Sequence, residues 1–171
     1  MSARLSWLNS LTAEEAAKEL LQCCGSKRWA AAMANARPYA TLETLLARAH
    51  EVWRSLDRND WLEAFRSHPK IGEKKAADKV SAQSQQWSGQ EQSGVANASK
   101  ETSSSLATLN QAYEQKFGFI FIICATGKTS ADMLAALRER LEHDPEAELP
   151  IAAAEQSKIT ALRLKKLLIS S

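Results

Sequence analysis

The 171-residue chain has few cysteines and lacks long apolar runs, the features that mark disulfide-rich secreted proteins and membrane proteins. Its cysteines are Cys23, Cys24 and Cys124, and an odd set with two adjacent members does not make a disulfide framework. Because disulfide-free chains fit a reducing compartment, we expect a cytoplasmic protein. The first residues carry acids early and lack the apolar centre of a signal peptide, and the chain does not end in a peroxisomal Ser-Lys-Leu. No apolar run is long enough to cross a bilayer, so we expect no membrane contact.

An excess of one charge is also lacking. The chain has 22 lysines and arginines against 20 aspartates and glutamates, a net charge of +2, and no basic block, so nucleic acid is not indicated as a partner. The only histidines, His50, His68 and His143, share no ligand spacing with one another or with the cysteines. We therefore predict no metal site.

One stretch invites a nucleotide-binding interpretation that the spacing excludes. ATGKTS (125–130) ends like a phosphate-binding loop, but that loop needs a glycine five residues before Gly127, where backbone amides wrap the phosphate. Ile122 stands there instead. The stretch is better interpreted as a turn that leads into a helix.

The residues that are abundant, namely Ala, Leu, Glu, Gln and Lys, favour helix, whereas aromatic residues make up only 6%. We predict an all-α fold: a single-domain multi-helix bundle over residues 1–171, with a short extended apolar segment near 118–125 (FIFIICA from 119). Gly118 should end the helix before that segment. Helices are expected at about 12–23, 28–36, 41–56, 60–67, 73–83, 88–116, 130–142 and 152–168.

His68 lies directly before Pro69 in the stretch FRSHPKIGEKK (65–75). The residue before a proline disfavours helical geometry, so His68 should fall where the preceding helix ends. An imidazole can give and take a proton near neutral pH, and Pro69 restricts where the ring can lie. Two interpretations stay open, an acid/base group and a hydrogen-bonded loop histidine, and these residues alone favour the second.

Glu91 and Arg163 also have two interpretations each. Ser88-Gly-Gln-Glu91 has the capping-box pattern, so Glu91 is first interpreted as a helix cap. Arg163 lies four residues after Ile159, on the same helix face. Its guanidinium either reaches outward to solvent or directs its planar fork at a buried carboxylate.

Together these residues resemble a known family. His68-Pro69-Lys-Ile-Gly72, Ser88-x-x-Glu91-Gln92, Phe117-Gly-Phe-x-Phe121 and Arg163-Leu164, in this order, are similar to motifs of the OHCU decarboxylases. The stretches CCGSKRW (23–29), ARPY (36–39) and DWLEAF (60–65) look like that family too. The resemblance covers nearly the whole chain, and four ordered motifs are specific although none is long.

The resemblance implies an all-helical homodimer without cofactor or metal. It implies decarboxylation of 2-oxo-4-hydroxy-4-carboxy-5-ureidoimidazoline (OHCU) to (S)-allantoin and CO₂ in urate breakdown. His68 would be the catalytic acid/base, Glu91 its acidic partner and Arg163 a further active-site residue. The substrate would be lined by Pro69, Ser88, Gln92, Phe117, Gly118, Phe119, Ile120 and Phe121. Many members carry proline where this chain has Ile120, which adds an amide donor to that backbone.

The proposed chemistry explains why no cofactor is expected. Loss of CO₂ leaves an electron pair on carbon, and the substrate's own C=N bond, next to the carboxyl-bearing carbon, can accept it. Two other functions remain open at this point. One is a non-catalytic helical binding domain, in which the three candidate residues are unrelated. The other is hydrolysis of a related ureido compound.

Overall fold

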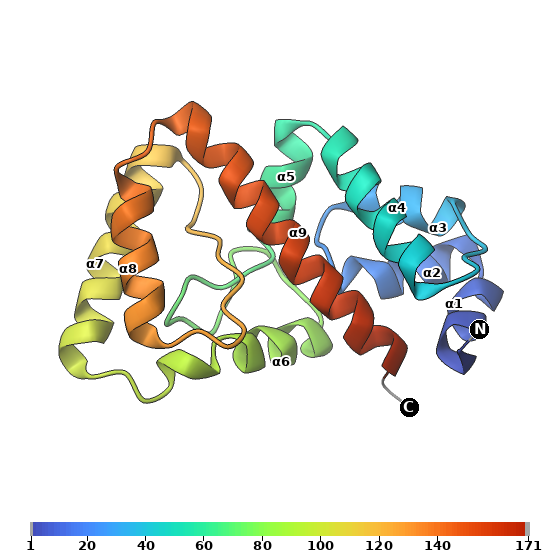
Figure 1. Ribbon diagram of the computed structural model, residues 1–171, viewed down its shortest axis with the longest axis horizontal. Helices are drawn as coiled ribbons and strands as arrows, with labels where there is room; N and C mark the ends of the chain where they lie inside the picture. Colours follow the sequence, from blue (N-terminus) through green and yellow to red (C-terminus); the bar gives the residue numbers. More distant parts are fainter. Residues whose placement is uncertain (1, 170–171) are drawn as a thin grey trace. The chain divides into compact units, whose positions relative to one another are not determined.

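A computed structural model describes residues 2–169, and over that range it contains nine α-helices, one short 3₁₀ helix and no strand, which confirms the all-α prediction. No helix in this range is long and apolar enough to cross a membrane. In chain order the elements are α1 (Ala3–Ser10), α2 (Ala13–Leu21), α3 (Lys27–Asn35), α4 (Leu42–Ser55), α5 (Arg58–Phe65), α6 (Ala82–Glu91), η1 (Ser93–Val95), α7 (Lys100–Phe117), α8 (Ser130–Leu141) and α9 (Pro145–Ile169) (Figure 1).

The chain divides into two compact units, and each is described by itself. Residues 2–64 and 157–169 belong to the first unit, and residues 65–156 form the second. Helix α9 contributes residues to both. The single domain over 1–171 stays a prediction.

The first unit is built from α1–α5 and the later part of α9. Thr12 caps α2 and exchanges hydrogen bonds with Glu15, as the capping-box pattern predicts. The indole of Trp29 is fully buried and donates to the carbonyl of Ala49 at 3.1 Å, which ties α3 to α4. Arg37 donates to the carbonyls of Leu8 and Leu11, where α1 ends. Side chains therefore satisfy the backbone groups that helix ends leave open.

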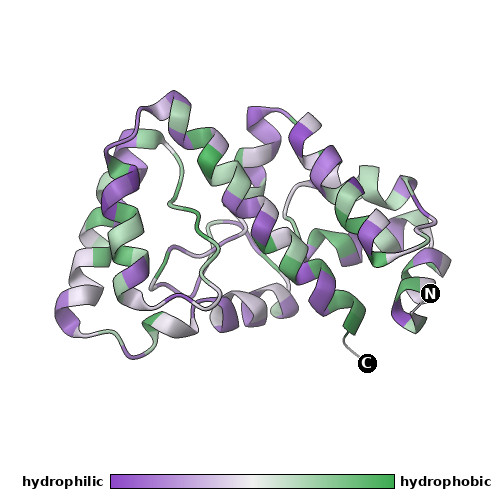
Figure 2. Cartoon of the chain, viewed as in Figure 1, coloured by the Kyte–Doolittle hydropathy of each residue, from purple (hydrophilic) through white to green (hydrophobic). Residues whose placement is uncertain are grey.

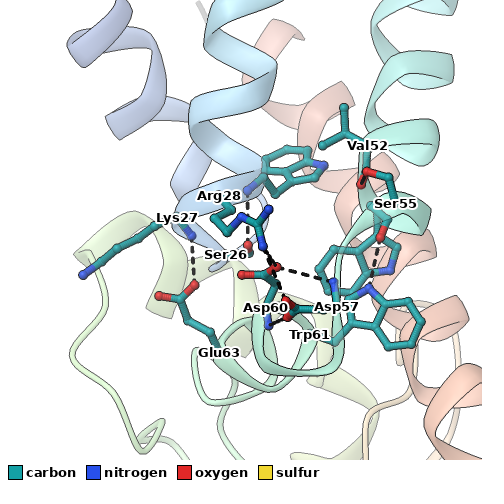
Figure 3. A network of polar contacts seen from close by, with 11 residues as sticks. Ser26, Lys27, Arg28, Val52, Ser55, Asp57, Asp60, Trp61 and Glu63 are labelled. Carbon is teal, nitrogen blue, oxygen red and sulfur yellow. Dashed lines mark hydrogen bonds and ion pairs between the residues drawn. The ribbon is translucent and has the colours of Figure 1, made fainter.

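Two of the family-like stretches meet inside this unit (Figure 3). Arg28, from CCGSKRW, lies 2.9 Å from the carboxylate of Asp60, from DWLEAF, and 3.4 Å from that of Asp57. The backbone N–H of Lys27 donates to Glu63 at 3.0 Å. These stretches therefore join the start of α3 to α5, which is a structural role.

The second unit contains α6, η1, α7, α8 and the first part of α9, and α7 and α8 lie side by side (Figure 1). Gly118 ends α7 in the left-handed conformation, with φ of 80°, as predicted. Two expected helices are wrong. Residues 73–81 form turns and irregular backbone, and the expected helix 88–116 is instead α6, η1 and α7. The 3₁₀ helix that begins at Ser93 and Gly94, with Ser99 as the new cap of α7, interrupts the periodic pattern.

Helix α9 begins earlier than the expected residue 152. Pro145 is its first residue, where a missing N–H costs nothing because first-turn amides have no helical partner. Pro150 lies inside the helix and cannot donate to the carbonyl four residues before, that of Glu146. Glu146 is exposed, so water can take the place of that donor.

The segment 119–125 is extended but pairs with no strand, and Figure 2 shows it as a largely green, apolar trace in the connection that leads from the end of α7 to the start of α8. Its backbone is hydrogen-bonded by side chains instead. Arg140 donates to the carbonyl of Ile122 at 2.5 Å, and the N–H of Cys124 donates to Glu155 at 3.2 Å. Lys128 donates to the carbonyl of Cys124 at 2.8 Å. Each buried backbone group without such a partner would destabilise the protein by about as much as a lost hydrogen bond.

Arg140 is itself held by a buried acidic residue. The carboxylate of Glu148 is fully buried and accepts from Arg140 at 2.6 Å and from the hydroxyl of Tyr113 at 2.5 Å. The ring of His143 lies 2.9 Å from its other oxygen. Burial and the bond to Glu148 raise the pKa of Tyr113, so its hydroxyl stays protonated and donates. This cluster connects α7, α8 and α9 to the extended segment.

Candidate functional site

His68 lies just beyond the end of α5, as the sequence predicts. Its backbone N–H donates to the carbonyl of Phe65 at 3.1 Å, and Pro69 pairs with Ala76 in an isolated β-bridge. The side chain is buried, with 8% of its surface exposed, so the ring is not a solvated loop group. Its Nε2 lies 2.6 Å from Oε1 of Gln156, a fully buried residue of α9. The ring is thus fixed by a contact that spans 88 residues of sequence.

The loop that follows His68 is anchored from two helices. The carbonyl of Ile71 accepts from the side-chain amide of Asn110 at 2.9 Å, and the N–H of Gly72 donates to Oε1 of Gln92 at 3.0 Å. Gly72 has φ of 91°, a conformation that favours glycine. Of the predicted substrate residues, Gln92 therefore supports the loop that carries His68.

Glu91 and Ser88 lie on the buried face of α6, together with Ser84 and Trp87. The capping interpretation of Ser88 and Glu91 is wrong, because Ser81 caps this helix and Glu91 is its last residue. Glu91 has 8% of its surface exposed.

The charge of Glu91 acts on Cys124 in the extended segment. Burial raises the pKa of Cys124, the positive charge of Lys128 opposes this, and the negative charges of Glu155 and Glu91 add to it. The negative charge of Glu91 thus acts at Cys124, three residues after the predicted substrate-lining stretch ends.

The second unit also holds a pocket of about 1090 Å³ between the loop after His68, α6 and α7. Three of the predicted substrate residues, Pro69, Ser88 and Gln92, line it, but His68 and Glu91 do not. Asn110, another lining residue, has a buried side-chain oxygen for which the described residues provide no hydrogen-bond donor. The pocket therefore borders the loop that carries His68 without containing the predicted catalytic side chains.

The predicted stretch 117–121 places its aromatic rings in the core. Phe117, Phe119 and Phe121 have 2–6% of their surface exposed, and each ring packs against that of Tyr113 at centroid distances of 4.5–5.9 Å. Ile120 is partly exposed. This packing fixes the path of the backbone between the rings.

Arg163 lies in the part of α9 that belongs to the first unit, whereas His68 and Glu91 belong to the second. Its side chain is 2% exposed, which excludes the outward-reaching interpretation, and Nη1 donates to the carbonyl of Gln22 at 3.1 Å. Burial raises the pKa of the nearby Cys24 to about 12 although the charge of Arg163 opposes the rise. Arg163 is thus a buried cation with at least one backbone acceptor.

Sequence reasoning missed Gln156, Arg140 and Glu148. A signal for Gln156 exists, because the buried positions of α9 recur every three or four residues and include Ala152, Ala153, Ile159 and Thr160. Gln156 is a polar residue on that apolar stripe, and such residues are informative. Arg140 and Glu148 lie in charged, helical stretches that carry no comparable signal.

Within residues 2–169, no group of three or more His, Cys, Asp or Glu side chains is arranged to hold a metal ion. None of the three cysteines forms a disulfide, and all three are buried.

Comparison with known proteins decides the family. The model of the family described as OHCU decarboxylase matches residues 9–165. The chain belongs to the OHCU decarboxylase family. It is 33% identical over 140 residues to 2-oxo-4-hydroxy-4-carboxy-5-ureidoimidazoline decarboxylase of Mus musculus. The aligned region covers 81% of this chain and 78% of that protein.

Two further relatives extend the comparison. A crystal structure of OHCU decarboxylase in the presence of (S)-allantoin is 41% identical, with a TM-score of 0.75, and the match covers 88% of this chain and 97% of that one. The uric acid degradation bifunctional protein TTL of Arabidopsis thaliana is 42% identical over 146 residues, 85% of this chain and 45% of that protein. The chain thus spans less than half the length of the bifunctional relatives that it matches.

Proposed function

We propose that the chain decarboxylates OHCU to (S)-allantoin and CO₂ in the breakdown of urate. The observation that carries the proposal is the family match over residues 9–165. It is supported by the 41% identity to an OHCU decarboxylase whose crystal structure was obtained with (S)-allantoin.

The reaction balances without a cofactor. The bond between the hydroxyl-bearing ring carbon and its carboxylate breaks, and its electron pair forms a double bond to the neighbouring carbon. The electrons of the substrate's C=N bond move to nitrogen, which takes a proton. The hydroxyl then loses its proton to become a carbonyl, and the carbon that bears the ureido group gains one. The protein must orient the carboxylate, supply and remove protons, and deliver the last proton to one face.

We assign these tasks to three residues. His68 acts as the acid/base that protonates the ring nitrogen or handles the hydroxyl proton, and its buried, fixed ring supports this role. Glu91 holds the hydroxyl or ureido group, and Arg163 binds an anionic or carbonyl oxygen, for which a planar guanidinium is suited. The proposed substrate-lining residues are Pro69, Ser88, Gln92, Phe117, Gly118, Phe119, Ile120 and Phe121.

The test uses substrate made in place. Urate oxidase and hydroxyisourate hydrolase generate OHCU from urate, and circular dichroism follows the appearance of (S)-allantoin. We expect the purified chain to accelerate that signal above spontaneous decay, and His68→Ala to abolish the acceleration while the far-ultraviolet spectrum stays helical. No acceleration by the wild-type chain would overturn the function. Release of ammonia in place of CO₂ would indicate hydrolysis of the ureido group instead.

We further propose a homodimer that acts in the cytoplasm without a cofactor. The family resemblance supports the dimer, and the three cysteines, none of which forms a disulfide, support a reducing compartment. Sedimentation equilibrium tests the dimer, for which a mass near twice 18.8 kDa is expected. A mass of one chain at micromolar concentration would contradict it.

A further inference from the structure

Gln156 is in direct contact with the ring of His68. Its Oε1 lies 2.6 Å from Nε2, and Gln156 is fully buried while His68 is 8% exposed. In the amide orientation of this structure the atom that faces the ring is the carboxamide oxygen, which only accepts hydrogen bonds, so Nε2 carries the proton in this contact. In a neutral imidazole the proton sits on one nitrogen only, which makes Nδ1 the basic nitrogen.

The contact is supported on both sides. The loop after His68 is held by Asn110 and Gln92, so the ring is attached to a fixed backbone. Gln156 lies on the buried stripe of α9, where its neighbours Ala152 and Ala153 on the preceding turn are also buried. A partner that is held on a rigid helix fixes orientation better than one on a loop.

The chemical nature of the partner also matters. A carboxylate at this position would favour the charged imidazolium, because an opposite charge stabilises it. An amide oxygen orients the ring without a full charge, so the ring can both release and recover its proton during a cycle. The decarboxylation proposed above needs both steps.

We propose that Gln156 is a positioning residue that selects the Nε2–H tautomer of His68 and thereby presents Nδ1 as the nitrogen that exchanges protons with the substrate. This inference rests on the proposed function for its consequence in catalysis, but the tautomer itself does not depend on activity.

The experiment compares Gln156→Leu, which removes the acceptor, with Gln156→Glu, which keeps an oxygen at the same place. Gln115→Leu is the matched control, because it makes the same change at an exposed glutamine of α7. We expect Gln156→Leu to lower kcat roughly ten- to a hundredfold and to change KM by less than about threefold. The magnitude is taken from histidines that ligate metals in other proteins, where loss of the residue that hydrogen-bonds the other ring nitrogen has an effect of this size. Gln156→Glu should recover kcat to within about tenfold of the wild type.

The second readout is the ¹⁵N nuclear magnetic resonance spectrum of the His68 ring, recorded above the pH at which the ring becomes neutral. We expect the Nε2–H tautomer in the wild type, Gln156→Glu and Gln115→Leu, and a mixture with Nδ1–H in Gln156→Leu. A wild-type ring protonated on Nδ1 would overturn the inference, and so would unchanged kcat with an unchanged tautomer in Gln156→Leu. If Gln156→Leu does not fold, the wild-type spectrum and the kcat of Gln156→Glu decide. An inactive wild type with the Nε2–H tautomer would refute the proposed function and leave the tautomer assignment standing.

Discussion

Replacement of Arg140 by methionine should strongly destabilise the second unit. Arg140 is 7% exposed and its partner Glu148 is fully buried, so Arg140→Met would leave a buried carboxylate without its cation. Removing one partner of a buried ion pair costs about 3–5 kcal/mol. The carbonyl of Ile122 would also lose its donor, which adds to the loss.

Unfolding by urea, followed by far-ultraviolet circular dichroism, measures this effect. Thermal unfolding is a second measurement. For a chain of this size each kcal/mol of lost stability lowers the melting temperature by about 2–4 °C, so a loss of 3–5 kcal/mol corresponds to a decrease of roughly 6–20 °C. Arg138→Met is the matched control, because Arg138 is an exposed residue of the same helix and its replacement should change stability by less than about 0.5 kcal/mol. A loss below about 1 kcal/mol in Arg140→Met, as for an exposed ion pair, would refute the account of this cluster.

Four further outcomes are expected. A Cβ at Gly94 would overlap the backbone carbonyl of Lys128, so Gly94→Ala should lower the melting temperature. A Cβ at Gly89, inside α6, meets nothing within 4 Å, so Gly89→Ala should stabilise the protein by about 0.5–1 kcal/mol and raise the melting temperature. Equal effects of the two substitutions would refute this contrast. Lys70→Met should cost no more than about 1 kcal/mol in urea unfolding, because its ion pair with Glu114 is partly exposed, and a larger loss would argue against that geometry. Burial raises the pKa of the Cys24 thiol to about 12, so the stability that the protonated thiol contributes is complete below pH 9 and is lost as the pH rises towards 12. Cys24→Ala should therefore reduce the decrease of the urea unfolding midpoint between pH 9 and 12. A decrease as large as in the wild type would contradict the raised pKa. Treatment with EDTA should leave the rate of OHCU decarboxylation unchanged, and a loss restored by a divalent metal would refute cofactor-free catalysis.

The helical fold was predictable because local signals agree with it. Thr12 with Glu15 marks the start of α2, and Gly118 marks the end of α7, and both depend only on neighbouring residues. The errors occur where a tertiary contact decides. Gly94 lies against the backbone of Lys128, a contact that no local pattern contains, and this close approach accompanies the break between α6 and α7.

The residues of the candidate site stay a prediction, and the structure adds where their side chains lie. His68 and Glu91 were identified through family resemblance, and local reasoning alone favoured a loop histidine and a helix cap. The structure buries both side chains and excludes the cap, because Glu91 is at the end of its helix. Gln156 was not found, since its contact with His68 joins residues that are 88 positions apart.

The central claim is that this chain removes CO₂ from OHCU with His68 as the acid/base. The most direct measurement is the rate of ¹³CO₂ release from OHCU labelled at the carboxylate, with wild-type protein, His68→Ala and no protein side by side. The account predicts that release with the wild type exceeds spontaneous decay, equals the (S)-allantoin formed, and falls to the protein-free rate in His68→Ala. Wild-type release at the protein-free rate, or full release by folded His68→Ala, would contradict it.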